Sequence, residues 1–124
     1  MSFRGLTVYQ KGFQLAMEIF SISKDFPGEE RYSLTDQIRR SSRSVCVTLG
    51  EAYRKRQHEK YFVNKVSDSD MENTETQVWI DFAFECGYIS TNQKADLLSR
   101  SEEVGKLLNH MMNNPEKYRR KSDK

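Results

Sequence analysis

Residues 36–56 read DQIRRSSRSVCVTLGEAYRKR and form the centre of the clearest helical pattern in the chain. Apolar residues recur around this stretch at spacings of three, four and seven, as expected for one buried helix face. Serines interrupt that face halfway along, at Ser41 and Ser42, and arginines stand beside them. These arginines are either a charged surface or internal struts of a helical bundle. The apolar face consists of Leu34, Ile38, Val45, Leu49 and Ala52.

The length and composition of the chain favour one small helical domain. A chain of 124 residues can bury one core, and its 2 prolines and 6 glycines leave long stretches open to helix formation. No apolar run approaches the roughly 20 residues needed to cross a bilayer, and the N-terminal sequence MSFRGLTVYQKGF lacks the apolar core of a signal peptide. We therefore expect a soluble cytoplasmic protein with no membrane partner.

Three further helices are predicted from the same kind of periodicity. The first covers about residues 6–24, the third begins within RQHEKYF and reaches about Cys86, and the fourth covers about residues 90–112. Short connections between amphipathic helices predict an all-α fold, an antiparallel up-down four-helix bundle formed by residues 1–114. The apolar stripe expected on the first helix is Leu6, Tyr9, Phe13, Ala16, Met17 and Phe20.

Charge is distributed in blocks, although the whole chain carries a formal net charge of only +2. Residues 37–60 hold seven Lys or Arg against two Glu, whereas residues 66–93 hold six Asp or Glu and no Lys or Arg. The tail, residues 115–124, holds five Lys or Arg against two acidic residues. It has no apolar stripe and is expected to be disordered. Basicity is therefore confined to patches of the chain.

The acidic block offers partners for the arginines of the second helix. Arg39 and Arg43 share a helix face, and Glu72 and Glu75 of the third helix are expected to meet them in structural salt bridges. The alternative is that these arginines, with Arg40, lie on the surface. Small polar residues of both helices are expected to form a layer at the same junction that sets helix register. This layer comprises Ser41, Ser42, Ser44, Thr48, Ser69, Asn73 and Thr76.

The best candidate for a nucleic-acid site is the basic cluster where the second helix ends, together with the tail. Cations at this end oppose the negative end of the helix dipole, and they can neutralise phosphates with release of counterions. Tyr53, His58 and Tyr61 lie among them and can stack on unpaired bases. The alternative is an ordinary solvated helix terminus. The candidate residues are Arg54, Lys55, Arg56, Lys60, Arg119, Arg120 and Lys121.

The segment VWIDFAF, residues 78–84, is apolar around most of a helix circumference. A helix of a monomeric bundle needs one apolar face, so part of this surface is expected to contact another subunit. The alternative is a monomer in which the first and fourth helices cover the segment from both sides. The residues expected at the oligomer interface are Val78, Trp79 and Phe82.

Motifs for catalysis and metal binding are missing from the sequence. The two histidines, His58 and His110, lack the spacing of helical metal sites, and the stretch DSDMENTE lacks the glycine that a calcium loop requires. Cys46 and Cys86 lie far apart without a CxxC spacing and are expected to be free core thiols. No enzyme activity, metal or cofactor is therefore predicted.

A family resemblance covers about residues 4–112. The stretch ERYSLTDQIRRSSRS resembles a motif of the proteins encoded within intervening sequences of bacterial 23S ribosomal RNA genes, as do LTVYQKGFQLAMEIF and EEVGKLLNHMM. The family's I-P-x-N-I-A-E-G stretch appears here as VCVTLGEA, which departs at the proline, the asparagine and the final glycine. The resemblance rests on Glu30, Arg31, Tyr32, Leu34, Gln37, Arg39, Arg40 and Ser44.

The resemblance implies a four-helix bundle that assembles into a ring-like homopentamer with a basic surface. Related accessory proteins of diversity-generating retroelements bind nucleic acid and a reverse transcriptase. Two functions are therefore expected: a non-enzymatic oligomeric protein that binds RNA or DNA, with RNA favoured, or a protein-interaction scaffold for such a nucleic-acid enzyme. The two differ in salt dependence, because phosphate binding falls steeply with ionic strength and an apolar protein contact does not.

Overall fold

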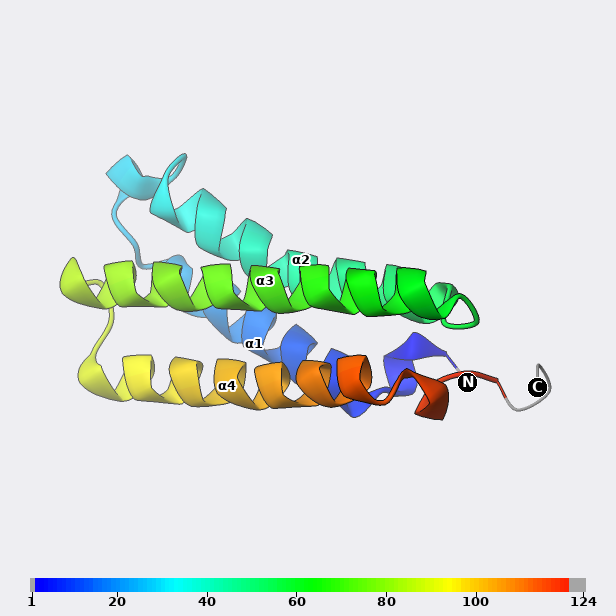
Figure 1. The fold of residues 1–124 in the computed structure, drawn as a ribbon. Helices are drawn as coiled ribbons and strands as arrows, with labels where there is room; N and C mark the ends of the chain where they lie inside the picture. Colours follow the sequence, from blue (N-terminus) through cyan, green and yellow to red (C-terminus); the bar gives the residue numbers. More distant parts are fainter. Residues whose placement is uncertain (1, 121–124) are drawn as a thin grey trace.

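Four long helices make up most of the computed structural model, which describes residues 2–120 (Figure 1). Consecutive helices run in opposite directions along the bundle (Figure 1). The all-α four-helix bundle is thereby confirmed, and no strand or helix able to cross a membrane is found within residues 2–120. The four α-helices and three short 3₁₀ helices are η1 (Phe3–Gly5), α1 (Thr7–Ser23), η2 (Gly28–Glu30), α2 (Leu34–Arg54), α3 (Glu59–Glu85), α4 (Thr91–Asn113) and η3 (Pro115–Lys117).

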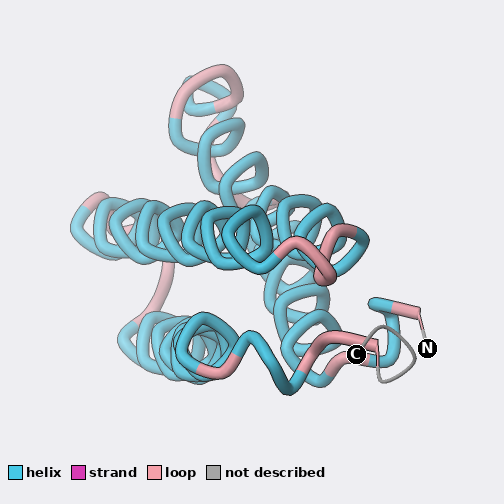
Figure 2. The backbone as a smooth tube through the Cα atoms, turned by 45° about the vertical axis from the view of Figure 1, so that its right-hand side comes forward, coloured by secondary structure: helices cyan, strands magenta, loops and turns pink. Residues whose placement is uncertain are grey.

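Three segments from distant parts of the sequence lie at one end of the bundle, which we call the turn end. They are η1, the turn between α2 and α3, and η3 (Figure 1). The turn comprises only residues 55–58, because α2 ends at Arg54 and α3 begins at Glu59. At the opposite end, Gly87 leaves α3 with a φ of 80°, a conformation that glycine adopts without strain. At this end, η2 and the first turns of α2 lie apart from α3 and α4 (Figure 2). The helices α3 and α4 pack side by side.

A buried polar layer divides the hydrophobic core into two clusters. One cluster surrounds Phe62 near the turn end, and the other surrounds Ile38 and Ile80 near the opposite end. Between them, Thr76 Oγ1 donates a hydrogen bond to Ser41 Oγ over 2.8 Å, and both side chains are buried. The polar layer expected between α2 and α3 therefore forms in part. Ser42 and Thr48, which were predicted to belong to it, donate instead to carbonyl oxygens of α2 itself.

Asn73 extends this layer to α4. Its Nδ2 donates to the Ser101 carbonyl oxygen, and Ser101 Oγ donates to Asn73 Oδ1, both over 2.9 Å. Gln77 Nε2 donates to the same Ser101 hydroxyl over 2.9 Å, and Ser69 Oγ donates to the Val45 carbonyl oxygen over 2.7 Å. Within the described residues, no buried side-chain nitrogen or oxygen lacks a hydrogen-bond partner. The layer therefore aligns three helices without leaving an unpaired polar group.

The buried face of α1 differs from the predicted stripe. Phe13 and Met17 are each 49% exposed, whereas Leu15 and Ile19 are buried. The reason is Gly12, where an added Cβ would lie only 3.4 Å from Cys46 Sγ. Because glycine has no side chain, α1 packs closely on α2 at this position, and Phe13 and Met17 are turned outward.

The predicted salt bridges between α2 and α3 do not form within residues 2–120. Arg39 Nε donates to Ser23 Oγ of α1 over 2.8 Å, and the guanidinium groups of Arg39 and Arg43 lie 4.8 and 5.6 Å from the Phe20 ring centroid. Positions two apart on a helix point about 200° from one another. Since Ser41 faces α3, both arginines are turned toward α1. The pairing of Arg39 and Arg43 with Glu72 and Glu75 was therefore a wrong prediction.

These contacts predict unequal effects of removing the two arginines. Arg39→Ala is expected to lower the free energy of unfolding by about 1 kcal/mol, because it removes a partly buried hydrogen bond and a cation–π contact. Arg43→Ala is expected to change it by less than about 0.5 kcal/mol, since Arg43 is exposed. Urea unfolding of both variants tests the difference. A loss above about 2 kcal/mol for Arg43→Ala would mean that Arg43 has a buried, charged partner, which the structure does not show among residues 2–120.

Candidate nucleic-acid interface

Positive charge is concentrated at the turn end of the bundle. Residues 2–6, 51–60 and 115–120 together contain eight Lys or Arg against three Glu. The carboxyl end of α2, with its negative partial charge, points into this region and stabilises nearby cations. The segments that sequence analysis selected for nucleic-acid binding are thus neighbours in space.

The start of the tail packs against this end, although the sequence pattern predicts a disordered tail. Pro115–Lys117 form η3, and the Tyr118 ring stacks on the Phe62 ring with centroids 5.8 Å apart. The Arg120 backbone N–H donates to Gln57 Oε1 over 2.6 Å. These two contacts hold the tail arginines beside Arg56 of the turn.

Four arginines line one pocket of about 520 Å³ at the turn end. They come from η1, from the last residue of α2, from the turn and from the tail. The other lining residues are Ser2, Phe3 and Tyr53, and among the described residues no Asp or Glu belongs to the lining. Among residues 2–120, the lining of the pocket is therefore rich in guanidinium groups and contains no carboxylate. The four are Arg4, Arg54, Arg56 and Arg120.

Aromatic rings support two of these guanidinium groups. Arg56 lies 4.1 Å from the Tyr53 ring centroid, and its Nη1 donates to the Tyr53 carbonyl oxygen over 2.9 Å. Arg4 lies 4.6 Å from the Phe3 ring centroid. Stacking restrains a guanidinium plane while its edge donors stay available, and two parallel N–H groups fit two phosphate oxygens.

The pocket unites three predicted residues with one that sequence analysis missed. Arg54, Arg56 and Arg120 belong to the predicted set, whereas Arg4 does not. Arg4 has no basic neighbours in the sequence, so no charge cluster marks it. It reaches the pocket because the Phe3 ring packs over Gly50, where an added Cβ would lie 3.6 Å from the ring.

The remaining predicted residues have different surroundings. Lys55 and Lys60 are exposed and do not line the pocket. Arg119 Nη1 lies 3.7 Å from Glu59 Oε1 in an exposed ion pair, which reduces its availability for a phosphate. Lys121 lies outside the described residues.

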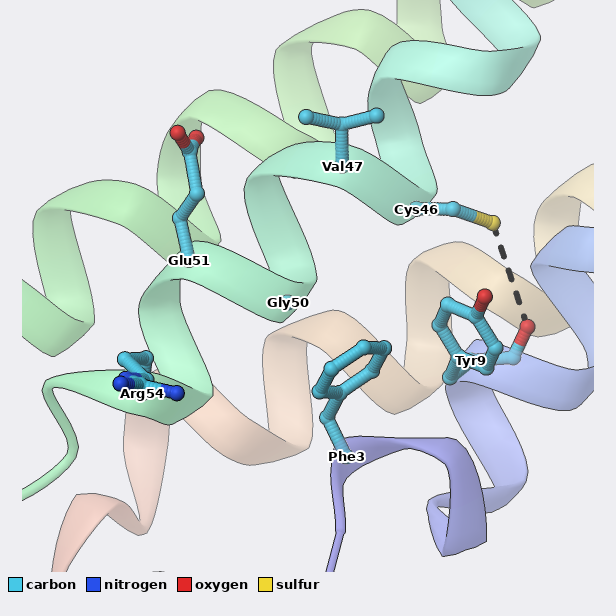
Figure 3. A pocket seen from close by; sticks show the side chains of 7 residues that line it. All are labelled: Phe3, Tyr9, Cys46, Val47, Gly50, Glu51 and Arg54. Carbon is cyan, nitrogen blue, oxygen red and sulfur yellow. Dashed lines mark hydrogen bonds between the residues drawn. The ribbon is translucent and has the colours of Figure 1, made fainter.

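A second pocket of about 380 Å³ opens between η1, α1 and α2 (Figure 3). The Phe3 and Tyr9 rings lie on one side of it, and Cys46 Sγ is 4.0 Å from the Tyr9 carbonyl oxygen (Figure 3). Burial raises the pKa of Cys46 to about 11, so this thiol stays protonated at neutral pH and is a poor nucleophile. Both cysteines are free, but Cys86 is exposed and not in the core as predicted.

The chemistry available at the turn end is anion binding. Guanidinium groups from four segments surround one volume, and two of them stack on aromatic rings. Exposed Tyr61 and His58 lie in the adjoining part of the turn and α3. In the part of the chain that the structure describes, no group of three or more His, Cys, Asp or Glu could hold a metal ion. A phosphate group is the natural ligand for such a pocket.

The sequence profile of the family described as 23S rRNA-intervening sequence protein matches residues 4–110. The chain belongs to this family. A crystal structure of a protein of unknown function from the S23 ribosomal protein family of Bacteroides thetaiotaomicron is similar to this 23S rRNA-intervening sequence protein, with 27% sequence identity and a TM-score of 0.77. The match covers 86% of this chain and 98% of that one. No curated protein matches significantly.

The family match confirms the resemblance inferred from ERYSLTDQIRRSSRS. It includes the arginines that η1, α2 and the turn contribute to the pocket of this 23S rRNA-intervening sequence protein. It ends before the tail, so Arg120 lies beyond the matched residues.

Proposed function

We propose that this 23S rRNA-intervening sequence protein is a non-enzymatic, oligomeric nucleic-acid-binding protein of the cytoplasm, and that its ligand is RNA. The observation that carries the proposal is the pocket lined by four arginines and, among residues 2–120, by no carboxylate. The exposed rings of Tyr61 and His58 beside the pocket favour a ligand with unpaired bases, such as RNA.

The pocket would bind RNA through its phosphates. Guanidinium groups form paired, charge-assisted hydrogen bonds with phosphate oxygens, and each neutralised phosphate releases a counterion. The exposed rings of Tyr61 and His58 provide stacking surfaces for unpaired bases. No element of the described chain is a groove-reading motif, so the expected binding depends on charge and unpaired bases more than on sequence.

Self-association is part of this proposal, and the family resemblance favours a homopentamer. Val78 and Phe82 of α3 are exposed, while Trp79 is partly buried and packs against the core. Exposed apolar residues on one helix are typical of a subunit interface. A ring would repeat the arginine pocket around its axis and raise the avidity for a polyanion.

The exposed apolar residues of α3 also support a second candidate function. A scaffold for a nucleic-acid enzyme such as a reverse transcriptase would use Val78 and Phe82 to bind that partner, without contacting nucleic acid itself. Such a contact would depend little on salt, whereas RNA binding through the arginine pocket would depend strongly on it.

A double charge reversal in the pocket tests the proposed function. Arg4→Glu with Arg54→Glu is expected to weaken binding of a fluorescent structured RNA at least about tenfold at about 50 mM salt, and to reduce the salt slope by about 2. The effect should be the same for RNAs of different sequence. Fluorescence anisotropy measures both quantities.

The matched control is Arg31→Glu with Arg100→Glu, which changes the net charge equally but lies outside the pocket. It should keep the affinity within about twofold, because sites beyond a Debye length are screened. Equal weakening by both pairs would show a diffuse charge effect, and the arginine pocket would then not be the binding site. Sedimentation and the unfolding midpoint should show that both variants remain folded and assembled.

A further inference from the structure

A second basic pocket, of about 280 Å³, lies at the end of the bundle opposite the turn end (Figure 1). The end of α1, the segment between α1 and α2, and the first turns of α2 form its wall. Three lining residues are cationic, and within residues 2–120 no Asp or Glu belongs to the lining. We call it the connection pocket; its lining includes Ser23, Lys24, Phe26, Arg31, Thr35 and Arg39.

Arg39 is held in place in the wall of the connection pocket by the end of α1. Its Nε donates to Ser23 Oγ over 2.8 Å, and its Nη2 donates to the Phe20 carbonyl oxygen over 3.5 Å. A guanidinium group carries further N–H donors, which these two bonds do not use. Arg39 is therefore a fixed cation that retains hydrogen-bond donors for an anion.

Lys24 and Arg31 add two positive charges at the mouth of the connection pocket. Both side chains are exposed, and the Lys24 ammonium lies 4.8 Å from the Phe20 ring centroid. None of Lys24, Arg31 and Arg39 forms an ion pair with an Asp or Glu in the described part of the chain. Their charge is therefore available to a ligand.

The acidic residues of the same segment lie outside the lining. Glu30 Oε2 accepts a hydrogen bond from the Tyr88 hydroxyl over 2.8 Å, and Asp36 pairs with Arg40 over 3.9 Å. Because these acids alternate with the cations along the chain, no basic block marks the connection pocket in the sequence. Two further acidic residues of the segment are exposed: Asp25 and Glu29.

Thr35 supplies a hydroxyl group without a partner. The residue is only 8% exposed, and its side chain forms no hydrogen bond with any other residue in the range 2–120. Every fully enclosed side-chain oxygen in that range is paired, so the Thr35 hydroxyl must be open to the pocket that it lines. Buried hydroxyl groups are normally hydrogen-bonded, and this one is therefore placed to bind a ligand.

The helix dipole of α2 also favours an anion at this position. Thr35 belongs to the first turn of α2, where the backbone N–H groups carry a positive partial charge. The side chain of Ser33, at the position preceding the helix, makes no capping hydrogen bond. The positive end of the helix, the cations and the Thr35 hydroxyl therefore attract a ligand of the same charge.

Phe26 gives the connection pocket one apolar wall. Its ring packs against the Tyr88 ring, with centroids 5.5 Å apart, and the residue is 9% exposed. A volume of about 280 Å³ is at the small end of ligand pockets, which hold about 300–1,000 Å³ when the ligand is drug-sized. The connection pocket therefore fits a phosphate group that carries a short organic body.

We propose that the connection pocket binds a small phosphomonoester. Arg39 and the Thr35 hydroxyl donate to the phosphate oxygens, Lys24 and Arg31 balance the charge, and Phe26 covers the organic body. This site is separate from the arginine pocket of the proposed function. Thr35 and Arg54 are about 29 Å apart along α2, which is more than two Debye lengths.

Calorimetric titration with glycerol 3-phosphate tests the proposal. Because the arginine pocket also attracts phosphate groups, every titrated protein carries Arg4→Glu and Arg54→Glu. Glycerol 3-phosphate is expected to bind with a dissociation constant below about 1 mM. Inorganic phosphate should bind more weakly, since it lacks a body to contact Phe26, and glycerol should not bind.

Two sets of substitutions locate the bound ester. Thr35→Val keeps the side-chain shape and should weaken binding about tenfold without lowering the unfolding midpoint, because the hydroxyl has no partner in the folded chain. Lys24→Gln with Arg31→Gln should weaken binding at least about tenfold. The matched control removes one Arg and one Lys from α4, Arg100→Gln with Lys106→Gln, and should keep the affinity within about twofold.

The proposal would be overturned by no binding of glycerol 3-phosphate at about 10 mM, by equal or tighter binding of inorganic phosphate, or by unchanged affinity in either connection-pocket variant. Equal weakening in the α4 control would also overturn it, since the effect would then be one of net charge.

RNA anisotropy separates this proposal from the proposed function. Lys24→Gln with Arg31→Gln, made in the chain with an intact arginine pocket, should keep the RNA affinity within about twofold. A loss of RNA affinity in this variant would assign the connection pocket to RNA and overturn the phosphomonoester proposal. Ester binding that follows the expected pattern in a protein that binds no RNA would reject the proposed function alone.

Discussion

Replacing Phe62 with alanine is expected to lower the free energy of unfolding by about 3–5 kcal/mol, the largest loss predicted for this chain. Phe62 is 0% exposed and belongs to the core cluster at the turn end with Leu49 and Val66. Its removal eliminates apolar burial and leaves a cavity between α2 and α3. It also removes the ring on which Tyr118 stacks.

Urea unfolding followed by circular dichroism measures this loss, and two controls separate its parts. Phe62→Leu keeps most of the volume and should lose less than about 1.5 kcal/mol. Tyr118→Ala removes only the ring of the tail and should lose about 1 kcal/mol. A loss below about 1 kcal/mol for Phe62→Ala would mean that this end of the core is not packed as the structure shows.

Asn73→Leu is expected to lower the free energy of unfolding by about 2–4 kcal/mol. The substitution removes the partner of the buried Ser101 hydroxyl and both hydrogen bonds between the two residues. It also brings a branched side chain against Gly105, where an added Cβ would lie 3.3 Å from Asn73 Nδ2. An apolar residue of similar size therefore does not compensate for the lost polar contacts.

A double-mutant cycle with Ser101→Ala tests the coupling. The two substitutions should be non-additive by about 0.5–3 kcal/mol, because both remove the hydrogen bond from Ser101 Oγ to Asn73 Oδ1. Asn64→Gln, at an exposed position on α3, serves as the control and should change stability by less than about 0.5 kcal/mol. Additive losses for Asn73→Leu and Ser101→Ala would contradict the polar layer.

The fold was predictable where the periodic pattern alone determines the buried face. The stripe of α2 and the polar layer at Asn73 and Thr76 follow from sequence spacing, and the structure buries them. The stripe of α1 was predicted incorrectly because helix rotation depends on a close contact between Gly12 and Cys46. Such contacts between helices are not encoded in the periodicity of either one.

The salt bridges failed for a related reason. Charge blocks show that Arg39 and Glu72 can attract one another, but they do not show which way each helix is turned. Since the polar layer directs Ser41 toward α3, Arg39 is committed to Ser23 and Phe20 of α1. Short-range packing, and not charge complementarity, therefore determined which residues Arg39 contacts.

The candidate site was predictable in part. A basic run at a helix end identifies Arg54 and Arg56, and the tail contributes Arg120, because clustered charge is visible in the sequence. The contribution of Arg4 and the enclosure of all four side chains depend on how η1 and the tail pack. The sequence therefore indicates a basic surface, whereas the structure shows a pocket.

The most direct test of the proposed function is a salt titration of RNA binding by the wild-type protein. If four arginines contact phosphates, log affinity should fall linearly with log salt with a slope of about −3 for single strands, which is about 50-fold between 50 and 200 mM. Fluorescence anisotropy with structured RNAs of unrelated sequence should give similar slopes. Absence of binding to RNA, duplex DNA and single strands at about 50 mM salt, or binding that does not change with salt, would contradict phosphate recognition by this pocket.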